Sequence, residues 1–146
     1  MTTVVDTNIV FSALLNTDSL IASILFNPTT TGFFYSLDFL KHEIINREEK
    51  LVKYSQLSTD QLRASRALIY QRIMFVSPDE IDAAIWQQAY QLCHDVDEND
   101  TPFVALTLHL NGELWTGDRK LSNGLRQKGF SQIISTGEVN KLITEL

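Results

Sequence analysis

The chain has little of several residue types, and each shortage argues against one class of protein. Cys93 is the single cysteine among 146 residues, so no intrachain disulfide can form, which fits a reducing cytoplasm. Three prolines and six glycines beside 44% hydrophobic residues are typical of an ordinary globular protein. No stretch approaches about 18 uninterrupted apolar residues, and no basic flank precedes Asp6. We therefore expect a cytoplasmic protein with neither a membrane span nor a secretory signal.

Positive charge is also scarce. The chain has 12 lysines and arginines against 18 aspartates and glutamates, a formal net charge of −6. This balance argues against a protein that holds DNA or RNA through a broad basic face. It does not exclude an enzyme that acts on nucleic acid, because bound divalent cations would cancel part of the acidic charge at its site.

Hydrophobic patterning predicts one α/β domain over residues 1–146, with no repeat or linker that divides it. Short apolar stretches that suit strands alternate with helical patterns. Strands are expected near residues 4–5, 32–37, 74–76, 113–116 and 132–135. Helices are expected to begin near residues 8, 19, 38, 58, 77, 101 and 119, with a last helix lined by Val139. Such alternation implies a mostly parallel sheet that helices cover on both faces.

Three local signals place the beginnings of helices. Asn8 is a good N-cap for the first helix. Ser58 and Gln61 form a capping box for a later one. The segment 77–80, Ser-Pro-Asp-Glu, combines a capping box with proline at the first helical position, and predicts a helix that runs to about His94. Cys93 would then lie on a helix, where a small buried hydrophobe is its expected role.

Carboxylates occur at four places that this fold could bring together. Asp6 and Asp118 each follow a strand, and the carboxyl ends of parallel strands border the crevice where open α/β sheets bind ligands. Glu43 lies on the first long helix. Asp100, with Asp97 shortly before it, opens the nearly all-apolar helix of the C-terminal half. Mg²⁺ and Mn²⁺ prefer oxygen ligands of this kind, and converging like charges do nothing for stability.

Each acid also has an ordinary structural reading, which the sequence leaves open. Asp6 and Asp100 are both acceptable N-caps, and Asp118 suits a turn. Glu43 could be a surface residue paired with Arg47, four positions later on the same helix. The ordered set of acids, rather than any one of them, favours a functional site.

That ordered set resembles the PIN-domain family. The matching segments are VVDTN at Asp6, KHEI at Glu43, DTPFVALTL at Asp100 and LWTGD at Asp118, in this order over nearly the whole chain. The resemblance implies a three-layer α/β/α sandwich with a mostly parallel central sheet. Small bacterial members resemble VapC-type toxins of toxin–antitoxin pairs, so it also implies a Mg²⁺- or Mn²⁺-dependent ribonuclease, commonly a homodimer, that an antitoxin protein holds inactive.

Carried over residue by residue, the resemblance makes four acids catalytic metal ligands: Asp6, Glu43, Asp100 and Asp118. Asp97 is a further candidate, because either it or Asp100 could supply the third ligand; its ordinary reading is an exposed acidic turn. Asn8 and Thr116 would be polar residues that orient the ligands. A metal-activated water would attack the phosphodiester, with no covalent enzyme intermediate.

Two surface features bear on partners. Four basic residues are candidate phosphate contacts, with a solvated helix face as the alternative: Arg119, Lys120, Arg126 and Lys128. The aromatic segment Phe33, Phe34 and Tyr35 could support the homodimer, with core packing as its alternative.

The competing functions are a phosphatase and a binding module. A phosphatase of the haloacid-dehalogenase type needs a second aspartate two residues after the first, and Asn8 stands there. No Gly-x-x-x-x-Gly-Lys loop indicates a nucleotide hydrolase. The remaining alternative is a PIN-like module that binds RNA or protein without catalysis.

Overall fold

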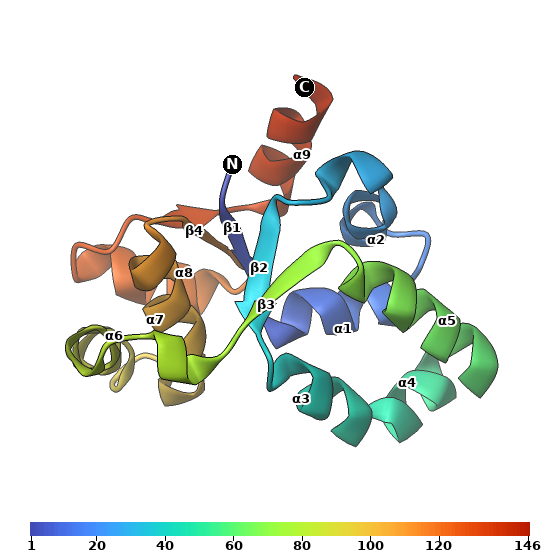
Figure 1. Ribbon diagram of the computed structural model, residues 1–146, viewed down its shortest axis with the longest axis horizontal. Coiled ribbons are helices and arrows are strands. Elements are labelled where there is room, and N and C mark those ends of the chain that lie inside the picture. The colour runs from blue at the N-terminus through green and yellow to red at the C-terminus, as the bar shows by residue number, and fades with distance from the viewer.

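The computed structural model describes residues 1–146, and its strands form one sheet in which every neighbouring pair is parallel (Figure 1). The spatial order is β3-β2-β1-β4-β5. The strands are β1 (Thr3–Val5), β2 (Phe34–Leu37), β3 (Ile73–Val76), β4 (Glu113–Trp115) and β5 (Ile133–Ile134). The predicted α/β class is therefore confirmed, and the sheet is parallel throughout.

Strand β1 is the centre of the sheet. Val4 pairs with Tyr35 of β2 on one side, and Val5 pairs with Trp115 of β4 on the other. The chain runs outward from β1 through β2 to β3, then crosses to β4 and runs outward to β5. The direction of winding thus reverses between β1 and β4, and in open α/β sheets the crevice at the carboxyl ends of such strands is the usual ligand site.

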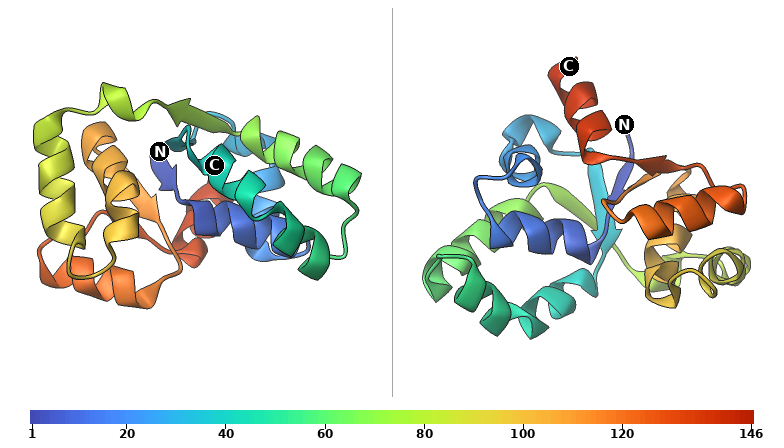
Figure 2. Two further views of the ribbon diagram at one scale, coloured as in Figure 1. Left: turned by 90° about the horizontal axis from the view of Figure 1, so that it is seen from below. Right: turned by 180° about the vertical axis from the view of Figure 1, so that it is seen from behind.

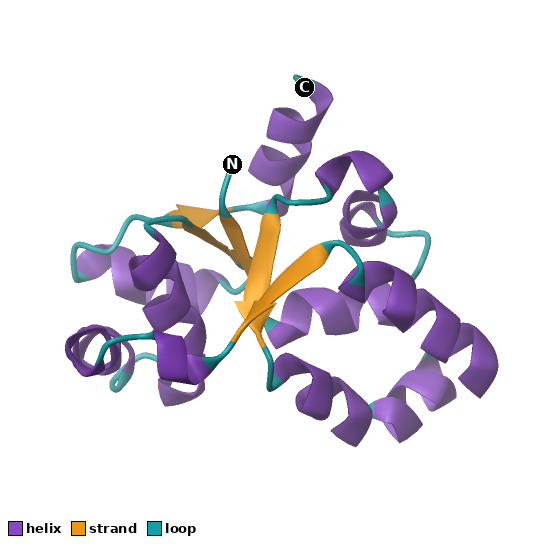
Figure 3. Cartoon of the chain, in the orientation of Figure 1, coloured by secondary structure: helices purple, strands orange, loops and turns teal.

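Nine α-helices cover the two faces of this sheet, as Figure 3 shows by setting the orange strands among purple helices. One layer holds α1 (Thr7–Leu15), α2 (Leu20–Phe26), α3 (Leu40–Asn46), α4 (Glu48–Tyr54), α5 (Thr59–Tyr70) and α9 (Thr136–Thr144). The other holds α6 (Ala83–Cys93), α7 (Thr101–Leu110) and α8 (Arg119–Gln127). Figure 2 shows the same division from behind. The expected three-layer sandwich is confirmed.

The sheet is apolar on both faces. Side chains alternate along a strand, so Val5, Trp115 and Ile134 enter one core. Their neighbours Val4, Leu114 and Ile133 enter the other. Strands covered on both faces read as continuous hydrophobic runs, which is why the sequence reveals them.

The aromatic segment before β2 belongs to these cores. Phe34 is fully buried, and its ring lies 5.6 Å from that of Trp115, centroid to centroid. Phe33 and Tyr35 are half-buried and pack against opposite cores. The segment therefore packs in the cores, with part of the Phe33 and Tyr35 surfaces left exposed.

Three predicted helix starts or spans are wrong. Helix α1 begins at Thr7 rather than after Asn8, because Asp6 takes the extended N-cap conformation (φ −85°, ψ 171°). The long helix expected from Asp38 is α3 and α4, separated where Arg47 leaves helical geometry (φ −104°, ψ 9°).

The third wrong prediction is the helix expected to begin at the Ser77 capping box. Its two reciprocal hydrogen bonds form, but they close a single 3-10 turn, Pro78–Glu80, and α6 begins only at Ala83. Two further 3-10 turns occur at Pro28–Thr30 and Glu98–Asp100. The Ser58–Gln61 capping box is confirmed at the start of α5.

No single helix has the length and hydropathy to cross a membrane; α1 and α2 together pass that test by length and composition only, and they meet at 104°. Cys93 is buried. Burial raises the pKa of its thiol to about 11, so the thiol stays protonated near neutral pH, as expected for a structural residue.

Candidate metal centre

Asp6 is both a helix cap and a buried acid. It follows the last residue of β1, and only 4% of its surface is exposed. Its Oδ1 accepts a hydrogen bond from the N–H of Ile9 at 3.0 Å, which caps α1. Burial raises the pKa of Asp6 to about 6, and the nearby charges of Asp118 and Glu43 add to this effect. Because capping uses Oδ1, the interpretations of Asp6 as a helix cap and as a metal ligand are compatible.

Asp118 occupies the equivalent position after β4. Its Oδ1 accepts from the N–H of Leu121 at 3.1 Å and caps α8. Its own N–H donates to Oγ1 of Thr116 at 3.1 Å. Thr116 therefore fixes the turn that carries Asp118, and the carboxylate itself is exposed to solvent.

Asp97 and Asp100 come from the turn between α6 and α7. Asp97 Oδ1 accepts from the N–H of Asn99 at 3.1 Å, which caps the 3-10 turn. Asp100 stands at the N-cap position of α7, yet its side chain makes no capping bond. The reading of Asp100 as a cap is therefore wrong. The pKa of Asp100 is raised to about 7, mainly by burial and to a smaller extent by the charges of Asp6 and Asp97.

Glu43 is held by a residue that the sequence analysis did not single out. The hydroxyl of Thr7 donates to Glu43 Oε1 at 2.7 Å, across 36 positions of sequence. No ion pair joins Glu43 to Arg47. Arg47 instead donates from Nη1 to Oδ1 of Asn8 at 3.2 Å, and its guanidinium lies 5.3 Å from the ring centroid of Phe11. Asn8 thus contacts Arg47 rather than a carboxylate.

These acids converge. Carboxylate oxygens of Asp97, Asp100 and Asp118 lie within 4.8 Å of one another. A cavity of about 150 Å³, here called the acidic cavity, is lined by Asp6, Thr7, Asn8, Glu43, Arg47, Asp97, Asn99, Asp100 and Phe103. A neighbouring cavity of about 320 Å³ shares Asp6 and Asn8 with it and reaches Thr116, Gly117 and Asp118. All five predicted acids therefore surround one place, with Asp6 between the two cavities.

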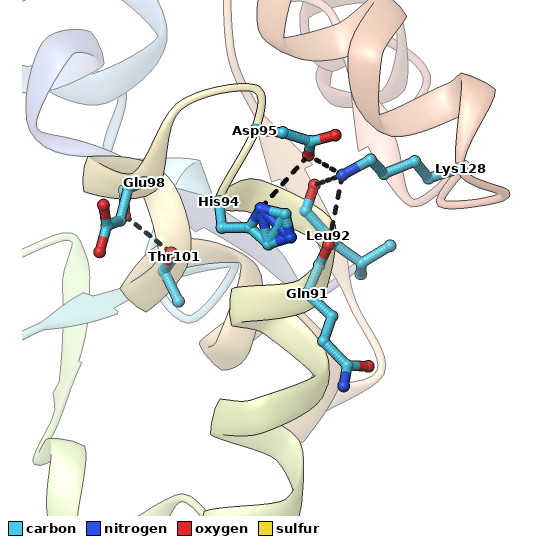
Figure 4. A network of polar contacts seen from close by, with 7 residues as sticks. All are labelled: Gln91, Leu92, His94, Asp95, Glu98, Thr101 and Lys128. Atoms are coloured by element: carbon cyan, nitrogen blue, oxygen red, sulfur yellow. Dashed lines mark hydrogen bonds and ion pairs between the residues drawn. The ribbon is translucent and has the colours of Figure 1, made fainter.

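Helix α8 fixes the turn that carries Asp97 and Asp100. Lys128, just after α8, pairs with Asp95, and its Nζ donates to the carbonyls of Gln91 and Leu92 at 3.2 and 3.1 Å (Figure 4). These carbonyls end α6, where a cation is favourable. A Cβ at Gly124 would lie 2.7 Å from Val96 Cγ1, so a larger residue there would displace the Val96 side chain. Lys128 is thus engaged in holding the turn.

The donor set suits a hard divalent cation. Only oxygen ligands face the acidic cavity, and Arg47 is the one cation among its lining residues. Mg²⁺ and Mn²⁺ are bound by carboxylates together with water. The raised pKa values of Asp6 and Asp100 show carboxylates whose ionisation the folded chain disfavours, and a bound cation would reverse that preference.

The fold and this site define a doubly wound α/β protein with an oxygen-donor acidic centre at its topological switch point. The chain belongs to the PIN-domain family, since a PIN-domain family model matches residues 4–137, from β1 into α9 and through all five acids. Proteins of this family are generally nucleases that use divalent metals. A search of the curated proteins found no significant match to the chain.

The first prediction concerns Asp6→Asn without metal. Asparagine can keep the cap through its Oδ1 while the buried charge is lost. Burial raises the pKa of Asp6 from 3.8, its value in the unfolded chain, to about 6 in the folded chain. Ionisation of Asp6 therefore does not lower the stability of the fold below the unfolded pKa, and this loss of stability grows until the pH has risen through the folded pKa. Thermal melts in EDTA should show equal stability of variant and parent near pH 3.5, roughly, and a more stable variant above about pH 6. Asp18→Asn, which changes an exposed acid beyond the far end of α1, serves as the control, and a variant-to-parent difference independent of pH would refute the buried charge.

The second prediction concerns Lys128→Met, which keeps most of the side-chain length but releases Asp95 and the end of α6. The turn carrying Asp97 and Asp100 should loosen, and Mn²⁺ affinity measured by calorimetry should fall by about 10-fold, as when groups that support metal ligands are removed. Lys120→Met changes an exposed lysine of α8 that forms no ion pair and should leave affinity unchanged. Equal Mn²⁺ affinities of Lys128→Met and Lys120→Met would show that the contacts of Lys128 do not support the metal site.

Proposed function

We propose that the protein is an endoribonuclease that hydrolyses phosphodiester bonds with Mg²⁺ or Mn²⁺. The observation that supports it most is the convergence of five acids at the switch point of a PIN-domain fold. Asp6, Glu43, Asp100 and Asp118 would hold the metal, with Asp97 beside Asp100 as an additional ligand. When bound, the metal would activate a water molecule and offset negative charge on the phosphate.

The chain's own residues hold this arrangement in advance. Cap hydrogen bonds fix Asp6 and Asp118, and the Thr7 hydroxyl fixes Glu43. Side chains that are locked by such contacts lose little freedom when the substrate arrives. Arg47 is held by Asn8 over Phe11, and its guanidinium is suited to a phosphate oxygen entering the acidic cavity.

The attacking group is water rather than a side chain. Cys93 is the only thiol, and it is buried with its pKa raised. The hydroxyl of Thr7 donates to Glu43 and therefore holds a ligand instead of attacking. Hydrolysis would proceed in one displacement, without a covalent intermediate on the enzyme.

The resemblance to VapC-type toxins extends the proposal to partners. We infer an RNA substrate, an antitoxin protein that blocks the acidic cavity, and a homodimer. A small gene for a basic and hydrophobic protein directly upstream would support the toxin role. Light scattering that gives a mass of 16.6 kDa, that of one chain, at micromolar concentration would refute the dimer.

The third prediction is metal-dependent cleavage. The purified protein should cut single-stranded or looped RNA with Mn²⁺ or Mg²⁺ and lose all cleavage in EDTA. Asp6→Asn should lose cleavage by at least about 100-fold, because a principal ligand is gone, while Asp18→Asn should cleave as the parent does. Cleavage that survives EDTA would contradict the mechanism. Metal-dependent RNA binding without cleavage would instead identify a non-catalytic module.

A further inference from the structure

A further polar cavity borders the acidic centre. It has a volume of about 380 Å³, lies between α8 and the beginning of α9, and is called here the arginine pocket. Thr116 and Gly117 line both this pocket and the cavity that contains Asp6 and Asp118. A strand bound at the acids can therefore continue into the arginine pocket.

Two arginines of α8 face this pocket. Arg119 and Arg126 are seven residues apart, which is close to two helical turns, so they lie on the same side of α8. Both are exposed, and neither forms an ion pair. Two cations without ion-pair partners on one side of a cavity fit an anionic ligand.

The other charges nearby leave the arginines available. Glu138 is the one acid that lines the pocket, and its Oε1 already accepts from the N–H of Ser135 at 3.1 Å. Hydrogen bonds from Ser135 lower the pKa of Glu138, with a smaller contribution from Arg126. Two arginines against one hydrogen-bonded carboxylate give the pocket a positive balance.

Only two of the four basic residues that the sequence suggests as phosphate contacts line this pocket. Lys128 is engaged with Asp95 and the end of α6. Lys120 does not line the pocket, whereas Arg119 and Arg126 do. Guanidinium groups bind phosphate through two parallel hydrogen bonds, so the two residues that face the pocket are also the better phosphate ligands.

We propose that the arginine pocket binds backbone phosphate of the RNA beside the bond that is cut, through Arg119 and Arg126. This inference rests on the proposed function and names how its substrate is held. Contacts to phosphate fix the position of a strand without reading its bases. The pocket therefore sets affinity and the path of the strand, from the acids along α8 toward α9, while sequence preference arises elsewhere.

The test is the salt dependence of cleavage by Arg119→Gln/Arg126→Gln. Each lost contact to a single strand removes about 0.7 from the slope of log affinity against log salt. The slope for KM should thus fall by about 1.4 for the double variant and about 0.7 for each single variant. KM at low salt should rise by about 10-fold or more, with kcat within about twofold, since the acids are intact. The control, Lys53→Gln/Lys141→Gln, removes the same charge from exposed positions of α4 and α9 outside both cavities.

The outcomes separate this inference from the proposed function. Equal KM values and slopes in the two double variants, with a cleaving parent, would overturn the arginine pocket alone. If the parent does not cleave, anisotropy with the same fluorescent RNA decides. Weaker binding by Arg119→Gln/Arg126→Gln than by the control still supports the pocket, whereas equal binding, or no binding by the parent, overturns it.

Discussion

A buried carboxylate at the end of the central strand is the constraint on which the site depends. Asp6 is 4% exposed, and a buried ionised group is costly unless hydrogen bonds or an opposite charge compensate it. Here one hydrogen bond caps α1, but the charges of Asp118 and Glu43 that act on Asp6 are of the same sign. A bound cation would supply the missing compensation, and this is the physical reason to propose the five acids as a metal centre.

The parallel sheet is what brings these acids together. Asp6 and Asp118 follow adjacent strands, β1 and β4, because the strand order reverses between them. The remaining acids arrive from outside the sheet: Glu43 on α3, and Asp97 and Asp100 on the turn that α8 fixes through Lys128 and Gly124. Helix α8 thereby joins the metal centre to the arginine pocket, because it begins at one and lines the other.

The sequence predicts those features whose causes are local. The apolar pairs in β1, β4 and β5 and the capping box of Ser58 follow from neighbouring residues alone. The start of α1 does not, because Asp6 and Asn8 are equally good caps, and only the folded chain shows that Asp6 is the cap. The contacts of Thr7 with Glu43 and of Lys128 with Gln91 join residues 36 and 37 positions apart, so only the folded chain reveals them.

Thermal unfolding with and without Mn²⁺ decides whether the acids form one cation site around Asp6. At about a hundred times the dissociation constant, the ion should stabilise the parent and Asp18→Asn alike by about 2.7 kcal/mol. It should stabilise Asp6→Asn much less, since the cap survives and the ligand does not. Equal stabilisation of all three proteins would place the metal elsewhere and leave Asp6 as a helix cap.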